Sequence, residues 1–374
     1  MYKNLAAALA AACFSLSPFF PASFAQAQTP AKSPVPSTPV KAAFVYVSPI
    51  ADAGWTHQHE AGRKEMMTAL GDKAVQSTFV ENVAEGADSE RVIRDLAKSG
   101  NDIIFTPSFG YMEPTMRVAK EFPNVKFESI TGYKRADNVS TANARYYEGR
   151  YLSGIIAGRM SKTGVAGFVA GFPIPEVMQG INAFTLGMRS VNPKAVVKVI
   201  WLDVWFDPPK EREAAMALFN EGVDVVSFQT ASTAIMAAAQ ERGKFAIGFH
   251  SNMNQVGPNA QLVAVTHQWG KYYADRVKAV ADGSWKSQDV WGGVREGMIR
   301  LDGFNAAIPK TVRAEVDKRQ RELATGKLHP FHAGATPILD NDGKVQIAAG
   351  KTLSDEQILQ MNWLAEGVQA PRRK

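Results

Sequence analysis

Short apolar runs alternate with helical patterns from Ala42 to Ala281, and this alternation restricts the fold more than any other feature of the chain. Strands that alternate with helices predict parallel sheets with helices on both faces. The fold class is therefore expected to be α/β, with doubly wound parallel sheets. The predicted strands are 42–47, 75–80, 102–106, 125–130, 165–170, 196–201, 223–228, 245–249 and 262–266.

The helical patterns between these runs come in two successive sets of strand–helix units. A chain of 374 residues is long enough for two separate cores. We therefore expect two similar lobes that face a cleft. The predicted helices are 56–70, 89–99, 114–121, 148–160, 176–190, 209–220, 234–241 and 272–281, followed by an extended segment at 292–302 and by helices at 309–324 and 354–367.

The N-terminus has the pattern of a secretory signal peptide, residues 1–27, with a charged start at Lys3 and an Ala-Gln-Ala cleavage site at 25–27. Residues 28–40 are rich in Pro, Ser, Thr and Ala, which predicts a disordered linker. The mature protein is expected to be exported and soluble, since no stretch is long enough to span a membrane. Cys13, the only cysteine, lies in the leader, so the mature chain would have neither disulfides nor thiolate metal sites.

Known catalytic and nucleotide-binding motifs are absent from the sequence. It contains no G-x-S-x-G, H-E-x-x-H, G-x-G-x-x-G or Walker pattern, and His57 and His59 stand too close in sequence to chelate one ion from a helix. We predict no catalytic residue, no metal and no cofactor. The formal charge of +6 is spread along the chain, which argues against a nucleic-acid partner.

The stretch 41–70 places a strand, a flexible turn, the large ring of Trp55 and a helix start near Thr56 in direct succession. Thr56 is a suitable N-cap residue. This layout is typical of a ligand site at the carboxyl edge of an α/β sheet. Taken alone, the stretch favours Trp55 as a core residue that caps the sheet, and it is the ends of the other strands that change this interpretation.

Aromatic rings and neutral hydrogen-bonding groups recur after successive strands. Flat rings with amide and imidazole partners suit a flat, neutral, nitrogen-rich ligand that stacks on π-faces and is read along its edges. A sugar is the other possibility, whereas a phosphate or carboxylate would need a Gly-rich cradle with Lys or an Arg clamp. The candidate ligand-binding residues are Asp52, Trp55, Phe109, Glu113, Trp205, Gln229, His250, Asn252 and His267.

An enzyme is the alternative from a different class of function. Asp52, Glu113 and Asp207 could form the acid–base set of an exported nucleoside hydrolase. Nothing in their spacing requires this, and Asp207-Pro208-Pro209 is better interpreted as a helix cap followed by a helix start.

Several motifs, in order, resemble those of the basic membrane protein family of ABC-transporter solute-binding proteins, which includes bacterial purine nucleoside receptors. The resemblance covers 41–283. The motifs are Asp52-Ala-Gly-Trp55, Phe109 followed by Glu113, the run from Tyr147 to Gly154, the run from Gly164 to Gly171 leading to Ile174-Pro175, Asn192-Pro193, Trp205-Phe-Asp-Pro208 and Gly248-Phe-His-Ser-Asn252.

This resemblance implies a type I periplasmic binding protein fold, in which two lobes joined by three crossovers close on a ligand. We expect an N-terminal lobe of 41–145 plus 250–285, a C-terminal lobe of 146–249 plus 286–330, and an extension at 331–374 packed on one lobe. In the nucleoside receptors a purine lies between two aromatic rings, and the matching positions here are Trp55 and Trp205.

The sequence departs from the family where nucleoside receptors carry charged partners for the ribose. They have an acidic run where this chain has Gly248-Phe-His250-Ser-Asn252, and a lysine near the position of His267. We therefore expect a monomeric periplasmic receptor for a free purine base, adenine first, that delivers it to an ABC permease and ATPase in the inner membrane. The alternatives are a purine nucleoside receptor, a sensor for a membrane partner and, less favoured, the hydrolase.

Overall fold

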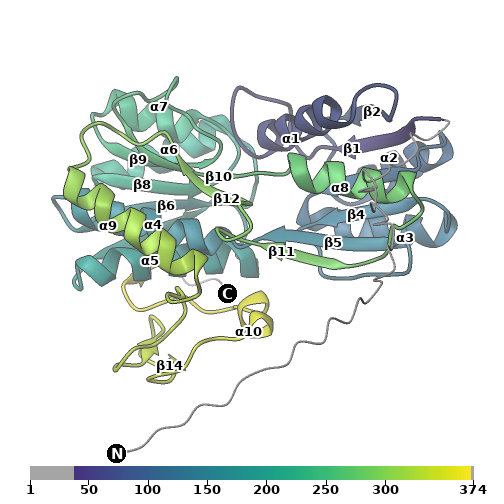
Figure 1. Ribbon diagram of the computed structural model, residues 1–374. Coiled ribbons are helices and arrows are strands. Elements are labelled where there is room, and N and C mark those ends of the chain that lie inside the picture. Colours follow the sequence, from purple (N-terminus) through teal and green to yellow (C-terminus); the bar gives the residue numbers. More distant parts are fainter. Residues whose placement is uncertain (1–37, 372–374) are drawn as a thin grey trace, which may run out of the picture. The chain divides into compact units, whose positions relative to one another are not determined.

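The structure, a computed structural model, describes residues 38–371, and these contain two large sheets (Figure 1). The first has the strand order β11-β5-β4-β3-β1-β2, and the second has the order β12-β10-β9-β8-β6-β7-β15. The predicted leader, 1–27, and most of the predicted linker, 28–40, lie outside the described residues. The linker prediction runs one residue too far, because Val40 already pairs with Val75 in the first sheet.

The first sheet is entirely parallel and belongs to the lobe on the right of Figure 1. Its central strand, β3, is buried along its whole length because helices cover both faces, and its apolar run reflects this. The elements of this lobe are β1 Val40–Val45, α1 Trp55–Leu70, β2 Val75–Val80, α2 Ala87–Lys98, β3 Ile103–Pro107, the short 3-10 helix Phe109–Tyr111, α3 Met112–Glu121, β4 Lys126–Ile130, β5 Val139–Ala144, α8 Gly270–Ala281 and β11 Asp289–Gly292.

The second sheet is parallel except for β12, which runs antiparallel to β10. Two of its helices, α4 and α5, pack against each other, and α4 also packs against β10. The elements of this lobe are α4 Tyr146–Met160, β6 Val165–Ala170, α5 Pro175–Val191, β7 Val196–Trp201, α6 Pro208–Asn220, β8 Val225–Gln229, α7 Ala234–Glu241, β9 Phe245–His250, β10 Gln261–His267, β12 Ile299–Asp302, α9 Lys310–Ala324 and β15 Val368–Gln369.

Within residues 38–371 the chain passes between the sheets three times, after β5, after β10 and after β11. The predicted lobe boundaries differ from this at two places. Residues 250–285 were assigned to the first lobe, but β10 within this range is the neighbour of β9 in the second sheet. Residues from 286 onward were assigned to the second lobe, but β11 pairs with β5 in the first. Strand β10 therefore belongs to the second lobe and strand β11 to the first, the reverse of the predicted assignment.

The C-terminal extension packs on the second lobe. Phe331, Ile347 and Ile358 share a small core with Tyr147 and Ala183 of α4 and α5. Its elements are β13 Ile338–Leu339, β14 Val345–Ile347, α10 Asp355–Leu359 and the edge strand β15.

The predicted helix 354–367 is wrong beyond its first turns. Asn182 donates to the carbonyl oxygen of Trp363 (2.9 Å) and accepts from the amide of Ala365 (2.8 Å). Gln179 donates to the carbonyl oxygen of Ile358 (2.8 Å). These side chains of α5 satisfy backbone groups that a continuing helix would have paired within itself.

Strand β5 was missed because its sequence, Val-Ser-Thr-Ala-Asn-Ala, lacks an apolar run. Its polar side chains are buried on specific partners: Ser140 accepts a hydrogen bond from Arg276 (2.8 Å), and Thr141 donates one to Asp289 (2.7 Å). The predicted cap of the first helix is also wrong, because α1 begins after Gly54 rather than at Thr56.

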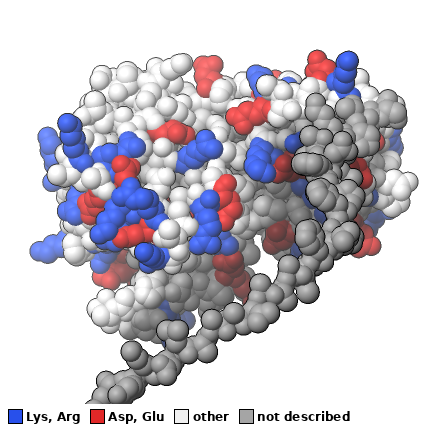
Figure 2. Space-filling view, in the orientation of Figure 1, with Lys and Arg blue, Asp and Glu red and all other residues white. Residues whose placement is uncertain are grey.

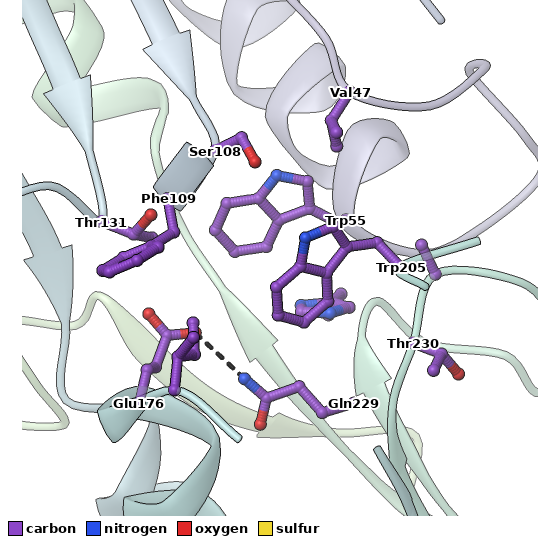
Figure 3. A pocket seen from close by; sticks show the side chains of 12 residues that line it. Val47, Trp55, Ser108, Phe109, Thr131, Glu176, Trp205, Gln229 and Thr230 are labelled. Atoms are coloured by element: carbon purple, nitrogen blue, oxygen red, sulfur yellow. Dashed lines mark hydrogen bonds between the residues drawn. The ribbon is translucent and has the colours of Figure 1, made fainter. Parts of the chain in front are cut away.

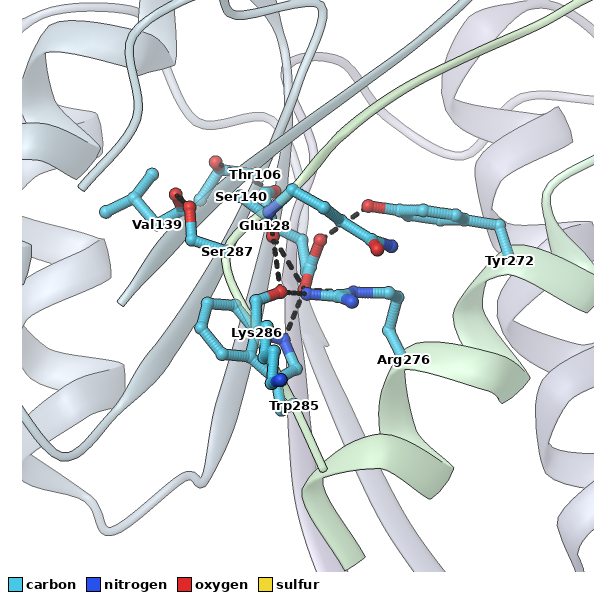
Figure 4. Close-up of polar contacts among 10 residues, drawn as sticks. Thr106, Glu128, Val139, Ser140, Tyr272, Arg276, Trp285, Lys286 and Ser287 are labelled. Atoms are coloured by element: carbon cyan, nitrogen blue, oxygen red, sulfur yellow. Dashed lines mark hydrogen bonds and ion pairs between the residues drawn. The ribbon is translucent and has the colours of Figure 1, made fainter. Parts of the chain in front are cut away.

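A buried ion pair holds α8 and the residues that follow it against the first sheet (Figure 4). Glu128 of β4 accepts hydrogen bonds from Tyr272 (2.5 Å), from Arg276 of α8 (2.7 Å) and from the indole of Trp285 (2.7 Å). Both ends of the pair are almost fully buried. The cluster fixes where α8 lies, and α8 in turn packs against α1, which carries Trp55 at its start.

Charges of both signs are mixed on the face shown in Figure 2. Within α9, Arg313 pairs with Asp317, and Arg319 with Glu322. Such a face lacks the single-sign field of a nucleic-acid footprint. Among residues 38–371, no helix combines the length and the apolar character needed to cross a bilayer.

Replacing Glu128 with alanine should lower the free energy of unfolding by about 3–5 kcal/mol, because Arg276 is left buried without its counter-charge. The matched control is Glu113→Ala, which breaks an exposed pair with Lys134 and should cost about 0–1 kcal/mol. Urea unfolding monitored by circular dichroism measures both. Equal effects of the two substitutions would show that the cluster does not anchor the lobe.

Candidate ligand-binding site

A partly open cavity of about 50 Å³ lies where the carboxyl ends of strands from both sheets meet. Its lining combines aromatic and apolar side chains with a few polar groups, as in small-molecule sites. Figure 3 shows the indoles of Trp55 and Trp205 and the ring of Phe109 pointing into the same space. The lining residues are Val47, Trp55, Ser108, Phe109, Thr131, Ile174, Glu176, Trp205, Gln229, Thr230, Ala231 and His250.

Trp55 stands at the first position of α1, half-buried in the cavity wall. Its indole N–H donates to the carbonyl oxygen of Pro107 at the end of β3 (2.8 Å). The ring of His59, one turn along the helix, meets the indole edge-on with centroids 4.2 Å apart. The bond fixes the indole while leaving part of the ring to line the cavity.

The turn before Trp55 requires a glycine. Gly54 has φ +103°, and a Cβ there would lie 2.1 Å from the carbonyl oxygen of Ala231 in the other lobe. The amide of Gly54 also donates to Ser251 (2.7 Å). The two lobes are therefore in contact beside the cavity, which is the arrangement of a closed cleft.

Trp205 approaches from the second lobe, on the loop after β7. Its indole packs edge-on against Phe172 (4.9 Å) and lies over Gly171, where a Cβ would be 2.6 Å from the ring. The carbonyl of Trp205 accepts from the amide of Ala231 (2.9 Å). Two loops at the same sheet edge thus hold this second indole against the cavity.

Polar groups occupy one edge of the cavity. Glu176, at the start of α5, accepts from the amide nitrogens of Gln229 (3.0 Å) and Asn143 (3.3 Å), and burial raises its pKa to about 7. The hydroxyl of Thr131 is buried and makes no hydrogen bond to the described residues. This edge therefore holds an acid close to its titration point, an amide and an unpaired hydroxyl.

Two lining residues have strained backbone conformations. Thr131, after β4, has φ +69°, and His250, at the end of β9, has φ +70°. Positive φ is uncommon for residues other than glycine, and for a β-branched residue such as threonine it is an outlier that the surroundings must hold in place. Both turns occur at strand ends, and both residues line the cavity.

Buried imidazoles form the wall behind Trp55. His250 Nδ1 and His267 Nε2 are 3.1 Å apart, and His59 bonds the hydroxyl of Tyr273 (2.5 Å). Burial lowers the pKa of His267 to about 3 and lowers the pKa values of His59 and His250 well below 6.5. All three rings are therefore neutral at pH 7. No group of acidic, histidine or cysteine side chains in the described part of the chain is arranged to hold a metal ion.

The structure brings five of the nine predicted residues together: Trp55, Phe109, Trp205, Gln229 and His250 line one cavity. The other four do not line it. Asp52 is exposed, and Glu113 is exposed and paired with Lys134. The side-chain oxygen of Asn252 accepts from Gln261 (2.9 Å), and His267 lies behind Trp55 with ring centroids 5.1 Å apart. Spacing after a strand does not show which way a side chain points.

Sequence reasoning missed Glu176, Thr131 and Ser108. Ile174-Pro175 was noted as a motif, but Glu176 was interpreted only as the start of a helix. An acidic residue in the first turn of a helix is common for electrostatic reasons alone, so it carried no signal. Asp207 behaves as predicted, since its carboxylate accepts from the amide of Lys210 and caps α6.

The model of the family described as "ABC transporter substrate-binding protein PnrA-like" matches residues 39–331. The chain belongs to this family. It is 50% identical over 329 residues to a purine-binding protein of Brucella abortus, covering 88% of this chain and 93% of that protein. It is also 36% identical to a putative ABC transporter glucose-binding protein of Haloferax volcanii, over 79% of this chain and 75% of the relative.

Solved structures share the fold at low identity. A solute-binding protein of an ABC transporter system from Aeropyrum pernix superposes with a TM-score of 0.68 at 21% identity, covering 78% of this chain and 93% of that one. One from Conexibacter woesei gives 0.64 at 22%, covering 78% and 98%. The expected type I periplasmic binding protein fold is confirmed. Family members are solute-binding proteins, so the chain is not an enzyme, and the hydrolase alternative is dropped.

The neutral histidines predict a loss of stability in acid. Their folded-state pKa values lie below the ordinary value near 6.5, so the unfolded chain binds more protons as the pH falls below 6.5. The stabilisation is complete above this pH and is lost as the pH falls, for His267 down to about pH 3. At pH 5 the protonation of unfolded His267 alone should cost about 2 kcal/mol of unfolding free energy relative to pH 7.

Urea unfolding at pH 7 and pH 5 measures this loss. His250→Gln should reduce the difference between the two pH values, whereas His332→Gln, at an exposed histidine, should leave it unchanged. Glu176, whose pKa is raised, acts in the opposite direction, so the comparison between variants is the readout. An identical loss in wild type and His250→Gln would contradict the account.

Proposed function

We propose that this PnrA-like substrate-binding protein is the periplasmic receptor of an ABC importer for a free purine base, with adenine preferred. The observation that carries the proposal is the convergence of Trp55 and Trp205, from different lobes, on one cavity with polar groups along its edge. The 50% identity to a purine-binding protein supports the same ligand class. The receptor acts as a monomer and delivers the base to a membrane permease.

Stacking supplies the affinity in this proposal. A base stacked on an aromatic side chain gains about 1–3 kcal/mol, whichever base it is. Because Trp55 belongs to the first lobe and Trp205 to the second, a base held between them draws the lobes together. Binding energy is thus coupled to hinge closure of the two lobes around the ligand.

Polar groups at the edge supply the selectivity. Adenine presents an amino donor beside a ring-nitrogen acceptor. The carboxyl of Glu176 accepts from an amino group, and the hydroxyl of Thr131 either donates or accepts. A ligand that left these groups unpaired would bind more weakly for two reasons. It would not form their hydrogen bonds, and it would still remove them from water without compensation.

The preference for a base over a nucleoside rests on three positions where the resemblance implies charged ribose partners. Here they carry His250, Asn252 and His267, and none of these brings a charged group to the cavity. Asn252 bonds Gln261 instead, and His267 is covered by Trp55.

A purine nucleoside is the second candidate, and a neighbouring cavity favours it. That larger space shares Phe109, Thr131 and Glu176 with the first cavity and adds Asp289 and Glu356. Carboxylates are suitable partners for ribose hydroxyls. A nucleoside could therefore place its base in the first cavity and its sugar in the second.

Calorimetric titration of the mature protein with adenine, adenosine, guanine, guanosine and glucose decides between these ligands. The proposal predicts that adenine binds tightest and that glucose gives no heat. Adenosine binding far more tightly than adenine would establish the nucleoside receptor instead. Heat from glucose alone would overturn the purine assignment.

Trp55→Ala should weaken adenine binding by about 10- to 100-fold, because one stacking face is removed. Trp55→Phe keeps a ring and should lose less. Trp363→Ala, which removes a half-buried tryptophan of the C-terminal extension, is the control and should leave affinity unchanged. Thermal unfolding of each variant verifies that the fold persists, and an unaltered affinity in Trp55→Ala would exclude Trp55 from the site.

A further inference from the structure

Three buried rings form a hydrogen-bonded row that ends at the cavity. The indole nitrogen of Trp269 lies 2.6 Å from Nδ1 of His267. Nε2 of His267 lies 3.1 Å from Nδ1 of His250. Trp269 and His267 are 1% exposed and His250 is 5% exposed, so water does not substitute for these contacts.

The row has only one consistent direction. An indole N–H can donate but cannot accept, so Nδ1 of His267 must be the acceptor and carries no proton. A neutral imidazole has a single N–H, which in His267 is then on Nε2 and is donated to Nδ1 of His250. The proton of His250 is therefore on Nε2.

Neutrality is required for this deduction, and the surroundings provide it. Burial lowers the pKa of His267 to about 3, and burial together with His267 and Arg150 lowers that of His250. A protonated His267 would turn a second N–H toward the indole N–H of Trp269, so that two donors would face each other. His59 stands outside the row, because its Nδ1 bonds Tyr273.

The outer end of the row is free for a ligand. His250 lines the cavity, and its Nε2 makes no hydrogen bond to the residues the structure describes. We infer that Trp269 and His267 are positioning residues that fix His250 as a hydrogen-bond donor, so that the site selects ligands with an unprotonated ring nitrogen or a carbonyl oxygen facing His250. This inference deepens the proposed function and rests on it for the identity of the ligand.

The selection acts by exclusion as well as by attraction. A ligand with an N–H at this position would face the N–H of His250, and the bound ligand would itself keep water from both groups. Leaving a buried donor unpaired costs more than a single hydrogen bond contributes. A free imidazole could change tautomer to suit either ligand, but the N–H of Trp269 removes that freedom.

Nitrogen-15 NMR of the histidine side chains in the ligand-free protein tests the tautomers directly. Signals are assigned by their loss in His250→Gln and His267→Gln. The inference expects both imidazoles to be neutral at pH 7 with the proton on Nε2. A proton on Nδ1 of His250, or an imidazolium at either position, would overturn it. This readout needs no ligand, so it stands apart from the proposed purine specificity.

Trp269→Phe removes the N–H that sets the direction and keeps a ring in the core. We expect mixed tautomers at His267 and His250, and about tenfold weaker adenine binding. Tyr273→Phe is the matched control, because it removes a buried hydrogen bond to His59 in the same cluster but outside the row. Unchanged tautomers in Trp269→Phe, or the same redistribution in both variants, would contradict the inference.

Adenine analogues that replace a single ring nitrogen with C–H test the contact with the ligand. The analogue altered at the nitrogen facing His250 should bind wild type about tenfold more weakly than adenine. This penalty should vanish in His250→Phe, which has no donor. A penalty that persists in His250→Phe for every analogue would show that His250 does not contact a ring nitrogen. Failure of all purines to bind would instead refute the proposed function and leave the NMR result in force.

Discussion

The hydrogen bond from the indole of Trp55 to the carbonyl of Pro107 is the contact on which the site depends. It ties the start of α1 to the end of β3, and so sets the position of the ring that each neighbouring group is packed around. The ring of His59 meets one side of the indole edge-on. The ring centroids of His250 and His267 each lie 5.1 Å from that of the indole, and the remaining surface of the indole lines the cavity. Without this bond nothing would tie the indole at the start of α1 to the end of β3.

A chain of support runs outward from this contact. Trp55 is held by α1, α1 packs against α8, and α8 is fixed to the first sheet by the buried pair of Glu128 and Arg276. In the other lobe, the carbonyl of Trp205 accepts a hydrogen bond from the amide of Ala231, and its indole packs directly on Gly171, which has no side chain in the way. The same Ala231 also touches Gly54, next to Trp55. Ala231 thus links the two segments that carry the indoles, so lobe closure and the shape of the site are coupled.

The sequence predicted the fold class, the order of most strands and helices, and five of the residues that line the cavity. These succeed because parallel strands leave their carboxyl ends at one edge, so the residues that follow each strand gather there. Strand β5 was missed because its polar side chains are stabilised by Arg276 and Asp289, which are distant in sequence. Asn252 and Glu113 were misplaced because side-chain direction depends on Gln261 and Lys134, their actual partners.

The hydrogen-bonded row of Trp269, His267 and His250 could not be predicted from the sequence either. Trp269 carried no expectation from the sequence, since only its 2.6 Å contact with His267 gives it a role. Likewise, Glu176 looked like an ordinary first-turn acid until burial and Gln229 placed it at the cavity edge. The roles of these residues depend on contacts between side chains of different elements, and a local sequence pattern does not show such contacts.

A crystal structure of the protein with adenine is the most direct test of the central claim, that indoles from opposite lobes hold a flat, uncharged base. The account predicts the base between Trp55 and Trp205, with its edge toward Glu176 and His250. A base bound elsewhere, or indoles turned into the lobe interiors of the closed form, would contradict it.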